Sequence, residues 1–519
     1  MRKRTSIWTV AMMACALSGA WAQDTTPPDE SSSQSTPQQP VPAYGQDTSA
    51  APVSENPPIS GLDLPSLEPH TAPLSYLQPG ATFSESADSN AASALGGSQH
   101  FTSLTHALGS LELRRLWSNY DLAIDYVGGV GYYSVKGQGA KLLQQMDLDQ
   151  KITWKRGQLS LRDSFSYLPE GNFGASYGSI GTQGVGSLAS TPFGAFMGGT
   201  VLGTFGLVPR ILNVADADVT QNLTPKSSVT AAGGYGFTHF YGSDVTTGTS
   251  FIGVSQLSGQ LAYDRVLTSH TQVALVYGYQ SFDFSVSGMA FHTHVIQGMY
   301  GHRITGRMDL LIGAGPQITK IDNQSAVCSD PTVTSILLCE LLGDTVVPTT
   351  IKDTRIGVAG IFRLRYKFPR TSLDLTYQRY ETSGSGIFAG AQTDIARMTV
   401  GRPLSRVWNA FFDMGYSRNS RLQTLSSQQL GNCVYQGQAN PTGLPLCPGL
   451  NANTYQTGFL GGGVHRQFGH DFHGFLSYQF NESVFDNSFC VAGTRCNRIS
   501  NRQVITFGLD WTPRPMRLD

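Results

Sequence analysis

Residues 355–380 read RIGVAGIFRLRYKFPRTSLDLTYQRY, and the alternation of side chains in this stretch decides the fold. Before the central Pro369-Arg370, the apolar and basic positions interleave as Ile356, Val358, Phe362, Leu364, Tyr366 and Phe368 against Arg355, Arg363, Arg365 and Lys367. After it, Leu373, Leu375 and Tyr377 alternate with Asp374, Thr376 and Gln378. A period of two is the period of a β-strand. The stretch therefore predicts two strands joined by a short turn, each with one apolar and one polar face.

The same two-faced pattern recurs along the chain, in residues 146–155, 256–264 and 505–511 among others. Short connections near Arg156, Pro225, Gly306 and Gly469 alternate with much longer ones, such as the connection after Leu168. Outer-membrane barrels have tight turns at one end and extended loops at the other, whereas a soluble β-sandwich has no reason to place its long loops at one end. Counting from Tyr120, we expect an all-β, transmembrane, antiparallel up-and-down barrel of about sixteen strands.

The composition agrees with a barrel that crosses a membrane with strands. Only 14% of the residues are charged, 40% are hydrophobic and 58 of the 519 are glycine. After residue 22, no apolar run approaches the length of a transmembrane helix, which takes about 20 residues. The formal net charge of -1 and the absence of a basic cluster indicate no nucleic-acid partner.

Residues 1–22 are predicted to be a signal peptide, because a basic start, a short apolar stretch and Ala20-Trp21-Ala22 follow one another. Residues 23–106 are rich in Pro, Ser, Gln and Thr, so we expect a disordered segment in the periplasm. Whether it is an interaction arm or a plain spacer stays open. The barrel is then expected to span residues 107–519, with residues 110–117 as a lead-in to the first strand.

Six cysteines follow the signal peptide, and all fall in the predicted long loops. They occur as near neighbours in the sequence: Cys328 and Cys339, Cys433 and Cys447, and Cys490 and Cys496. An even number in an exported chain predicts disulfide bonds, and the short separations favour local pairing, although six thiols allow fifteen connectivities. No pair has the spacing of a zinc site, so we expect no bound metal.

The four tryptophans after the signal peptide lie beside predicted short turns or at the end of the last strand: Trp117, Trp154, Trp408 and Trp511. Indole rings prefer the headgroup level of a bilayer, where an apolar ring and an N–H donor are both accommodated. These residues are therefore predicted to form an aromatic girdle at the periplasmic end.

Together, the signal peptide, the alternating strands, the asymmetry of turns and loops and the aromatic girdle resemble the outer-membrane porin class over residues 107–519. The resemblance is one of architecture and involves no diagnostic motif. It implies passive diffusion of small hydrophilic solutes, since barrels of sixteen to eighteen strands leave an aqueous channel. Two features depart from that class: the chain ends in residues 513–519 without a terminal aromatic residue, and the longest loop, 169–208, contains Glu170 as its only acid. The sequence leaves open whether this loop plugs the lumen.

Charged residues on the polar faces are the candidates to line the pore: Asp125, Lys151, Arg162, Arg363, Arg365, Lys367, Asp374 and Arg397. Rings of charge set the barrier for permeating ions, and the basic run at 363–367 would favour anions near the periplasmic mouth. The alternative is that these charges pair with acids such as Asp147, Asp149 or Asp264 and only fill the wall.

Two other functions compete with a pore. A non-conducting barrel would display disulfide-braced loops for surface adhesion. A membrane-embedded hydrolase would need a nucleophile beside a base, for which His292 and His294 near Ser285 and Ser287, or His239 near Ser243 and Asp244, are the nearest approach. Histidines at loop edges are ordinary, so we expect no enzyme, no catalytic residues and no cofactor.

The expected surroundings follow from the outer-membrane location in a Gram-negative cell. Outer-membrane lipids, lipopolysaccharide and the barrel-assembly machinery are the predicted partners. Whether the barrel forms a homo-oligomer and which solute it passes are not decided by the sequence.

Overall fold

The computed structural model describes residues 75–90, 101–134, 139–168, 209–241, 253–284, 290–328, 346–384, 388–422, 453–487 and 498–518. All of them belong to the compact unit Pro42–Asp519, while the unit Met1–Val41 lies outside the described residues. No helix in the described ranges is long and apolar enough to cross a membrane.

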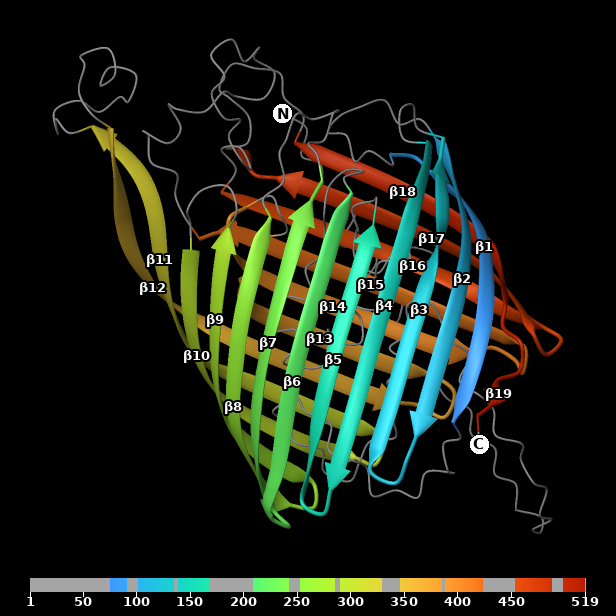
Figure 1. The fold of residues 1–519 in the computed structure, drawn as a ribbon, viewed down its shortest axis with the longest axis horizontal. Coiled ribbons are helices and arrows are strands. Elements are labelled where there is room, and N and C mark those ends of the chain that lie inside the picture. Colours follow the sequence, from blue (N-terminus) through green and yellow to red (C-terminus); the bar gives the residue numbers. More distant parts are fainter. Residues whose placement is uncertain are drawn as a thin grey trace, which may run out of the picture. The chain divides into compact units, whose positions relative to one another are not determined.

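The described residues form one antiparallel sheet whose first and last long strands pair with each other (Figure 1). Its strands are β1 Tyr76–Asp88, β2 Thr102–Leu116, β3 Tyr120–Tyr133, β4 Gly139–Trp154, β5 Gly157–Leu168, β6 Arg210–Thr224, β7 Ser227–Phe240, β8 Val254–Thr268, β9 Thr271–Phe284, β10 Ala290–Thr305, β11 Met308–Cys328, β12 Val346–Lys367, β13 Ser372–Thr382, β14 Ala391–Pro403, β15 Trp408–Arg421, β16 Thr454–Phe468, β17 Phe472–Phe485, β18 Ile499–Trp511 and the short β19 Met516–Arg517. Each strand from β1 to β17 pairs with the next in the chain, and β1 pairs with β18, from Ala81 opposite Trp511 to Asp88 opposite Val504. The sheet is therefore a closed up-and-down barrel of 18 strands.

The predicted count of about sixteen strands is wrong by one hairpin. The sixteen strands counted from Tyr120 are β3 to β18, and β1 and β2 precede them. The start of the barrel at residue 107 and the disorder of residues 76–88 and 102–106 are corrected accordingly, since β1 pairs along its whole length with β2, over residues 81–88 with β18 and over residues 76–77 with β19. These pairings satisfy its backbone hydrogen bonds on both edges and complete the ring. The remaining part of the predicted disordered segment, 23–74, lies outside the described residues.

The two ends of the barrel differ as predicted from the connections. At one end, successive strands are joined through residues 117–119, 155–156, 225–226, 269–270, 306–307, 368–371, 404–407 and 469–471. Gly469 has a φ of +73°, a left-handed conformation that glycine adopts without steric cost, and it begins the last of these turns. At the other end the connections are mostly longer, the longest being 169–209. The long β11–β12 hairpin extends beyond its neighbours at that end (Figure 1).

The side chains of the barrel are distributed in the reverse of a water-soluble protein. Large apolar residues are exposed on the outer face, with exposed fractions of 54% for Leu261 and 56% for Phe507. On the opposite face of the same sheet, Asp218, Thr293 and Asp413 are each 0% exposed. Contacts between non-adjacent strands identify that second face as the inner one: the hydroxyl groups of Thr293 on β10 and Thr319 on β11 both donate hydrogen bonds to Glu381 on β13.

Candidate functional site: the charged lumen

All eight predicted pore-lining residues lie on the inner face of the barrel. The strand register places Asp125, Lys151 and Arg162 on β3, β4 and β5, and the remaining five on β12, β13 and β14: Arg363, Arg365, Lys367, Asp374 and Arg397. That they line a conducting pore stays a prediction.

One side of the lumen carries a row of acids across three neighbouring strands. Glu112, Asp125 and Asp147 are directly opposite one another on β2, β3 and β4. Glu112 accepts a hydrogen bond from the Tyr76 hydroxyl, and Asp147 accepts one of 3.1 Å from the Gln145 amide. Asp125 is exposed to the lumen. This acidic wall faces the interior of the barrel.

Next to the acidic wall, Arg162 on β5 forms ion pairs with the neighbouring strand β6. Its guanidinium lies 3.1 Å from the Asp216 carboxylate and 2.7 Å from the Asp218 carboxylate, and both aspartate side chains are 0% exposed. Charge-assisted bonds of this kind neutralise acids that would otherwise be buried without compensation. Arg162 is therefore paired, as the alternative interpretation predicts, and its partners Asp216 and Asp218 are not among the acids named from the sequence.

The basic run of β12 lies on the far side of the ring from the acidic wall, because β12 is nine strands from β3 in either direction around the barrel. Arg363 binds Asp374 at 2.9 Å, and Arg365 lies 3.9 Å from the same carboxylate. Lys367 follows on the same face at the short-turn end. One carboxylate shared by two arginines, with a lysine beside them, leaves this wall net positive. A transverse electric field between the two walls follows from the arrangement.

Arg397 on β14 is paired as well. Its Nη2 lies 2.7 Å from Asp413, whose side chain is 0% exposed. Four of the predicted cations thus contact buried or partly buried acids, namely Arg162, Arg363, Arg365 and Arg397.

The four tryptophans are partly exposed on the outer face at the short-turn end, between 36% for Trp408 and 48% for Trp117. The guanidinium of Arg115 lies 5.2 Å from the Trp117 ring centroid, and that of Arg466 lies 5.3 Å from the Trp408 ring. The Trp154 indole donates a hydrogen bond of 3.0 Å to Gln221. These positions fit an interfacial girdle, which stays a prediction.

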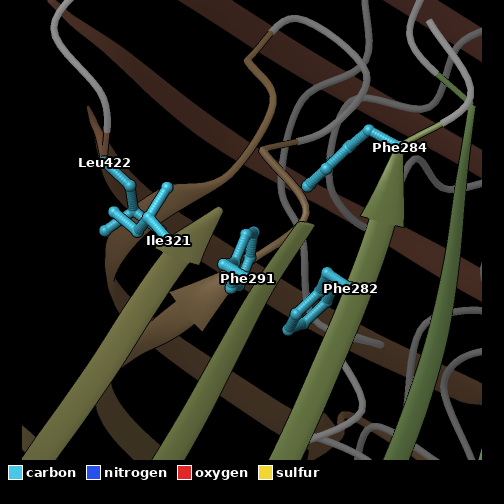
Figure 2. Packing of buried hydrophobic residues seen from close by; sticks show 5 residues of the cluster. All are labelled: Phe282, Phe284, Phe291, Ile321 and Leu422. Carbon is cyan, nitrogen blue, oxygen red and sulfur yellow. The ribbon is translucent and has the colours of Figure 1, made fainter. Parts of the chain in front are cut away.

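An apolar cluster lies inside the barrel toward the long-loop end (Figure 2). Leu422, directly after β15, packs against Phe282, Phe291 and Ile321 on the inner faces of β9, β10 and β11. The backbone of Gly390, with a φ of +84°, passes so close that a side chain there would collide with Phe291. The ends of β13 to β15 are therefore held against the inner wall formed by β9 to β11.

Next to this cluster, toward the short-turn end, the inner wall contains a hollow of about 60 Å³ that opens to the lumen. We call it the glutamine hollow, since five of its lining residues are Gln260, Gln280, Gln297, Gln317 and Gln378. They come from β8, β9, β10, β11 and β13, and the lining is completed by Val276, Gly278, Val295, Met299, Ala359, Gly360, Ile361, Arg379 and Tyr380. The hollow lies where the pairing of β12 with β13 stops, at Gly360 opposite Arg379. It is not among the sites that the sequence predicts.

The histidines considered for a hydrolase lie on the outer face. His292 and His294 hydrogen-bond through Nδ1 with the hydroxyls of Tyr279 and Tyr277, at 3.1 and 2.9 Å. The serines considered with them, Ser285, Ser287 and Ser243, and also Asp244, lie outside the described residues. So does the sequence GASYG at 174–178, which matches the Gly-x-Ser-x-Gly pattern of serine hydrolases but needs a strand–turn–helix context to carry meaning.

The predicted disulfides cannot be followed in the structure. Cys328 ends β11, and the other five cysteines and the loop 169–208 lie outside the described residues.

No protein-family model matches the chain, and no curated protein matches it. Among solved structures it is similar to the closed form of the ferric-catecholate import receptor Fiu from E. coli K12, with 8% identity, a TM-score of 0.39, and 84% of this chain and 81% of the receptor covered. It is also similar to Pseudomonas aeruginosa OpdQ, with 8% identity, a TM-score of 0.36 and coverage of 85% and 98%, and to P. aeruginosa OprD, with 7% identity, a TM-score of 0.36 and coverage of 84% and 95%. Similarity at this level does not establish a shared fold, so the barrel is assigned from its own strand pairing.

Proposed function

We propose that the chain is an outer-membrane barrel that lets small hydrophilic solutes diffuse through a polar lumen. The observation that supports this most directly is the inverted distribution of side chains, with exposed Leu, Ile and Phe outside and Ser, Thr, Asp and Arg inside. A closed barrel satisfies every wall hydrogen bond internally, which is the condition for strands to cross a bilayer. Barrels of sixteen to eighteen strands are wide enough to leave an aqueous channel.

The charges of the lumen support a pore that discriminates by charge. A solute passing between the acidic wall of β2 to β4 and the basic run of β12 is oriented by opposite charges on its two sides. Ions of either sign find compensating groups, while the excess of Arg365 and Lys367 near the short turns favours anions at that mouth.

Planar-bilayer recording of the purified mature chain tests the proposal. Stable conductance steps, together with swelling of liposomes in isotonic sugar solutions, are the expected result. The same quantity of chain kept unfolded in urea until addition is the control. A folded barrel that inserts into the bilayer and carries no current would contradict the proposal.

A non-conducting display barrel is the second candidate, and one observation favours it. The apolar cluster around Leu422 occupies part of the lumen near the long-loop end. If that cluster closes the channel, the recordings stay silent in the wild type, and replacing Leu422 by Ala opens a current that the wild type lacks.

A further inference from the structure

The glutamine hollow has the composition of a recognition site for a neutral solute. Each glutamine amide offers two hydrogen-bond donors and one acceptor oxygen, so amides can match neighbouring hydroxyl groups in either direction. Val276, Val295 and Met299 form an apolar patch between them. Small-molecule sites commonly combine an apolar lining with a few polar groups.

The hollow presents little net charge. Arg379 is the only charged residue among the described residues that line it. Its guanidinium is 3.5 Å from Asp394 and donates a hydrogen bond of 3.1 Å to Gln392. Since that charge is compensated, the hollow gives an ion no advantage over a neutral molecule.

Gln317 shows that the hollow is not saturated by internal hydrogen bonds. Its side chain is 1% exposed and lies near the Glu381 carboxylate, yet neither its amide nitrogen nor its oxygen makes a hydrogen bond of normal geometry with a described residue. Its nitrogen therefore has the Glu381 carboxylate as a neighbour, whereas a buried amide oxygen without a donor is costly and gains free energy when a ligand donates to it. Gln297 and Gln378, half-buried on either side, are accessible to the same ligand.

We propose that the glutamine hollow is a binding subsite for an uncharged, polyhydroxylated solute, of the chemical class of a sugar ring. The amides of Gln297, Gln317 and Gln378 bind its hydroxyl groups, and the apolar patch packs against its C–H face. This deepens the proposed pore function and rests on it, because the subsite lies on the route through the lumen.

Binding is tested on the full barrel in a detergent without a sugar headgroup, by isothermal titration with glucose, maltose and sucrose, and with gluconate as the charged counterpart of glucose. At least one sugar is expected to bind, and gluconate is expected to bind more weakly than glucose. Titrations in which none of the sugars binds, or in which gluconate binds most tightly, would overturn the proposal.

Variants locate the binding. Gln297→Leu and Gln378→Leu are each expected to lower the affinity about fivefold, since a net hydrogen bond contributes about 1 kcal/mol. Gln272→Leu is the matched control: this glutamine lies on the inner face of β9 outside the hollow, and its loss should leave the affinity unchanged. An equal loss in all three variants, or no loss in any, overturns the assignment to the hollow.

The folding of the variants and the conductance of the wild type are measured in separate experiments. Heat-modifiable migration in a gel confirms that each variant is folded, and the conductance of the wild type is recorded separately without sugar. If the wild type conducts but binds no sugar, the subsite proposal is wrong and the pore proposal stands. If the wild type binds sugar but carries no current, the pore proposal is wrong and the sugar site stands.

Discussion

Charged side chains of the inner face have two roles: buried ones stabilise the wall of the barrel, and exposed ones set the charge of the lumen. Arg162 is nearly buried between two fully buried carboxylates and stabilises the wall. Arg365 has a side chain that is 42% exposed and lies at 3.9 Å from Asp374, so its charge acts on the lumen as well as on its partner. Substitutions at the two positions should therefore affect different properties.

Replacing Arg162 by Met should lower the stability of the barrel by about 3–5 kcal/mol, because it leaves Asp216 and Asp218 buried without a counter-charge. Urea-dependent folding into lipid vesicles, followed by tryptophan fluorescence, measures this. Arg114→Met is the control: its pair with Asp121 is partly exposed, so its loss should cost at most about 1 kcal/mol. Equal effects of the two substitutions would refute the bracing role.

Replacing both Arg363 and Arg365 by Gln should shift ion selectivity toward cations, since two positive charges are lost and the Asp374 carboxylate is left uncompensated. The reversal potential in a salt gradient across a planar bilayer reports the shift. Arg370→Gln, in the exposed turn, should change it little. An unchanged reversal potential in the double variant counts against a role of these arginines in the pore.

Individual polar faces were predictable from the sequence, but their partners were not. The alternation at 355–380 assigns Arg363 and Asp374 to one face, because a strand has only two faces. The partners of Arg162 come from a strand some fifty positions later in the chain, beyond the longest loop. The glutamine hollow was missed for the same reason: its five glutamines lie on five strands, and only the register of the closed barrel brings them together.

Among the strands, those of the β1–β2 hairpin are the ones that the sequence does not predict. β1 contains Pro79, Gly80 and two serines, a composition that by itself predicts disorder. Pairing with β2 on one edge and β18 on the other stabilises it, and both partnerships are tertiary. The other sixteen strands were recognised because their apolar faces alternate clearly with polar ones.

A cysteine pair tests the closure at β1. Ala87 and Ile505 are direct partners across β1 and β18 on the outer face. Cα atoms of such partners are about 4.5–5.5 Å apart, within the range of a disulfide. The variant with Cys at both positions should cross-link on oxidation, as detected by peptide mass mapping.

The control places the second cysteine at Leu509 instead, four residues along β18 and therefore roughly 13 Å further away. It should not cross-link to position 87. A barrel closed between β3 and β18, as a sixteen-stranded ring requires, would give no link in either variant.

For the barrel as a whole, the proposed position in a membrane requires a different solvent at each face of the sheet. The apolar outer residues of adjacent strands form continuous rows, such as Leu261, Tyr277 and Ile296 on β8, β9 and β10. A water-soluble protein rarely exposes apolar rows of this extent, whereas a membrane barrel needs them. The inner rows, with their ion pairs and glutamines, need water or a polar solute.

The most direct test is the accessibility of single spin labels along β12 in barrels reconstituted into liposomes, with oxygen as the lipid-soluble and a nickel complex as the water-soluble relaxing agent. The account predicts strict alternation: oxygen dominates at Phe362, Leu364 and Tyr366, and the nickel complex dominates at Arg363, Arg365 and Lys367. Equal access of the nickel complex to both sets would contradict it, because then water would bathe both faces of the sheet.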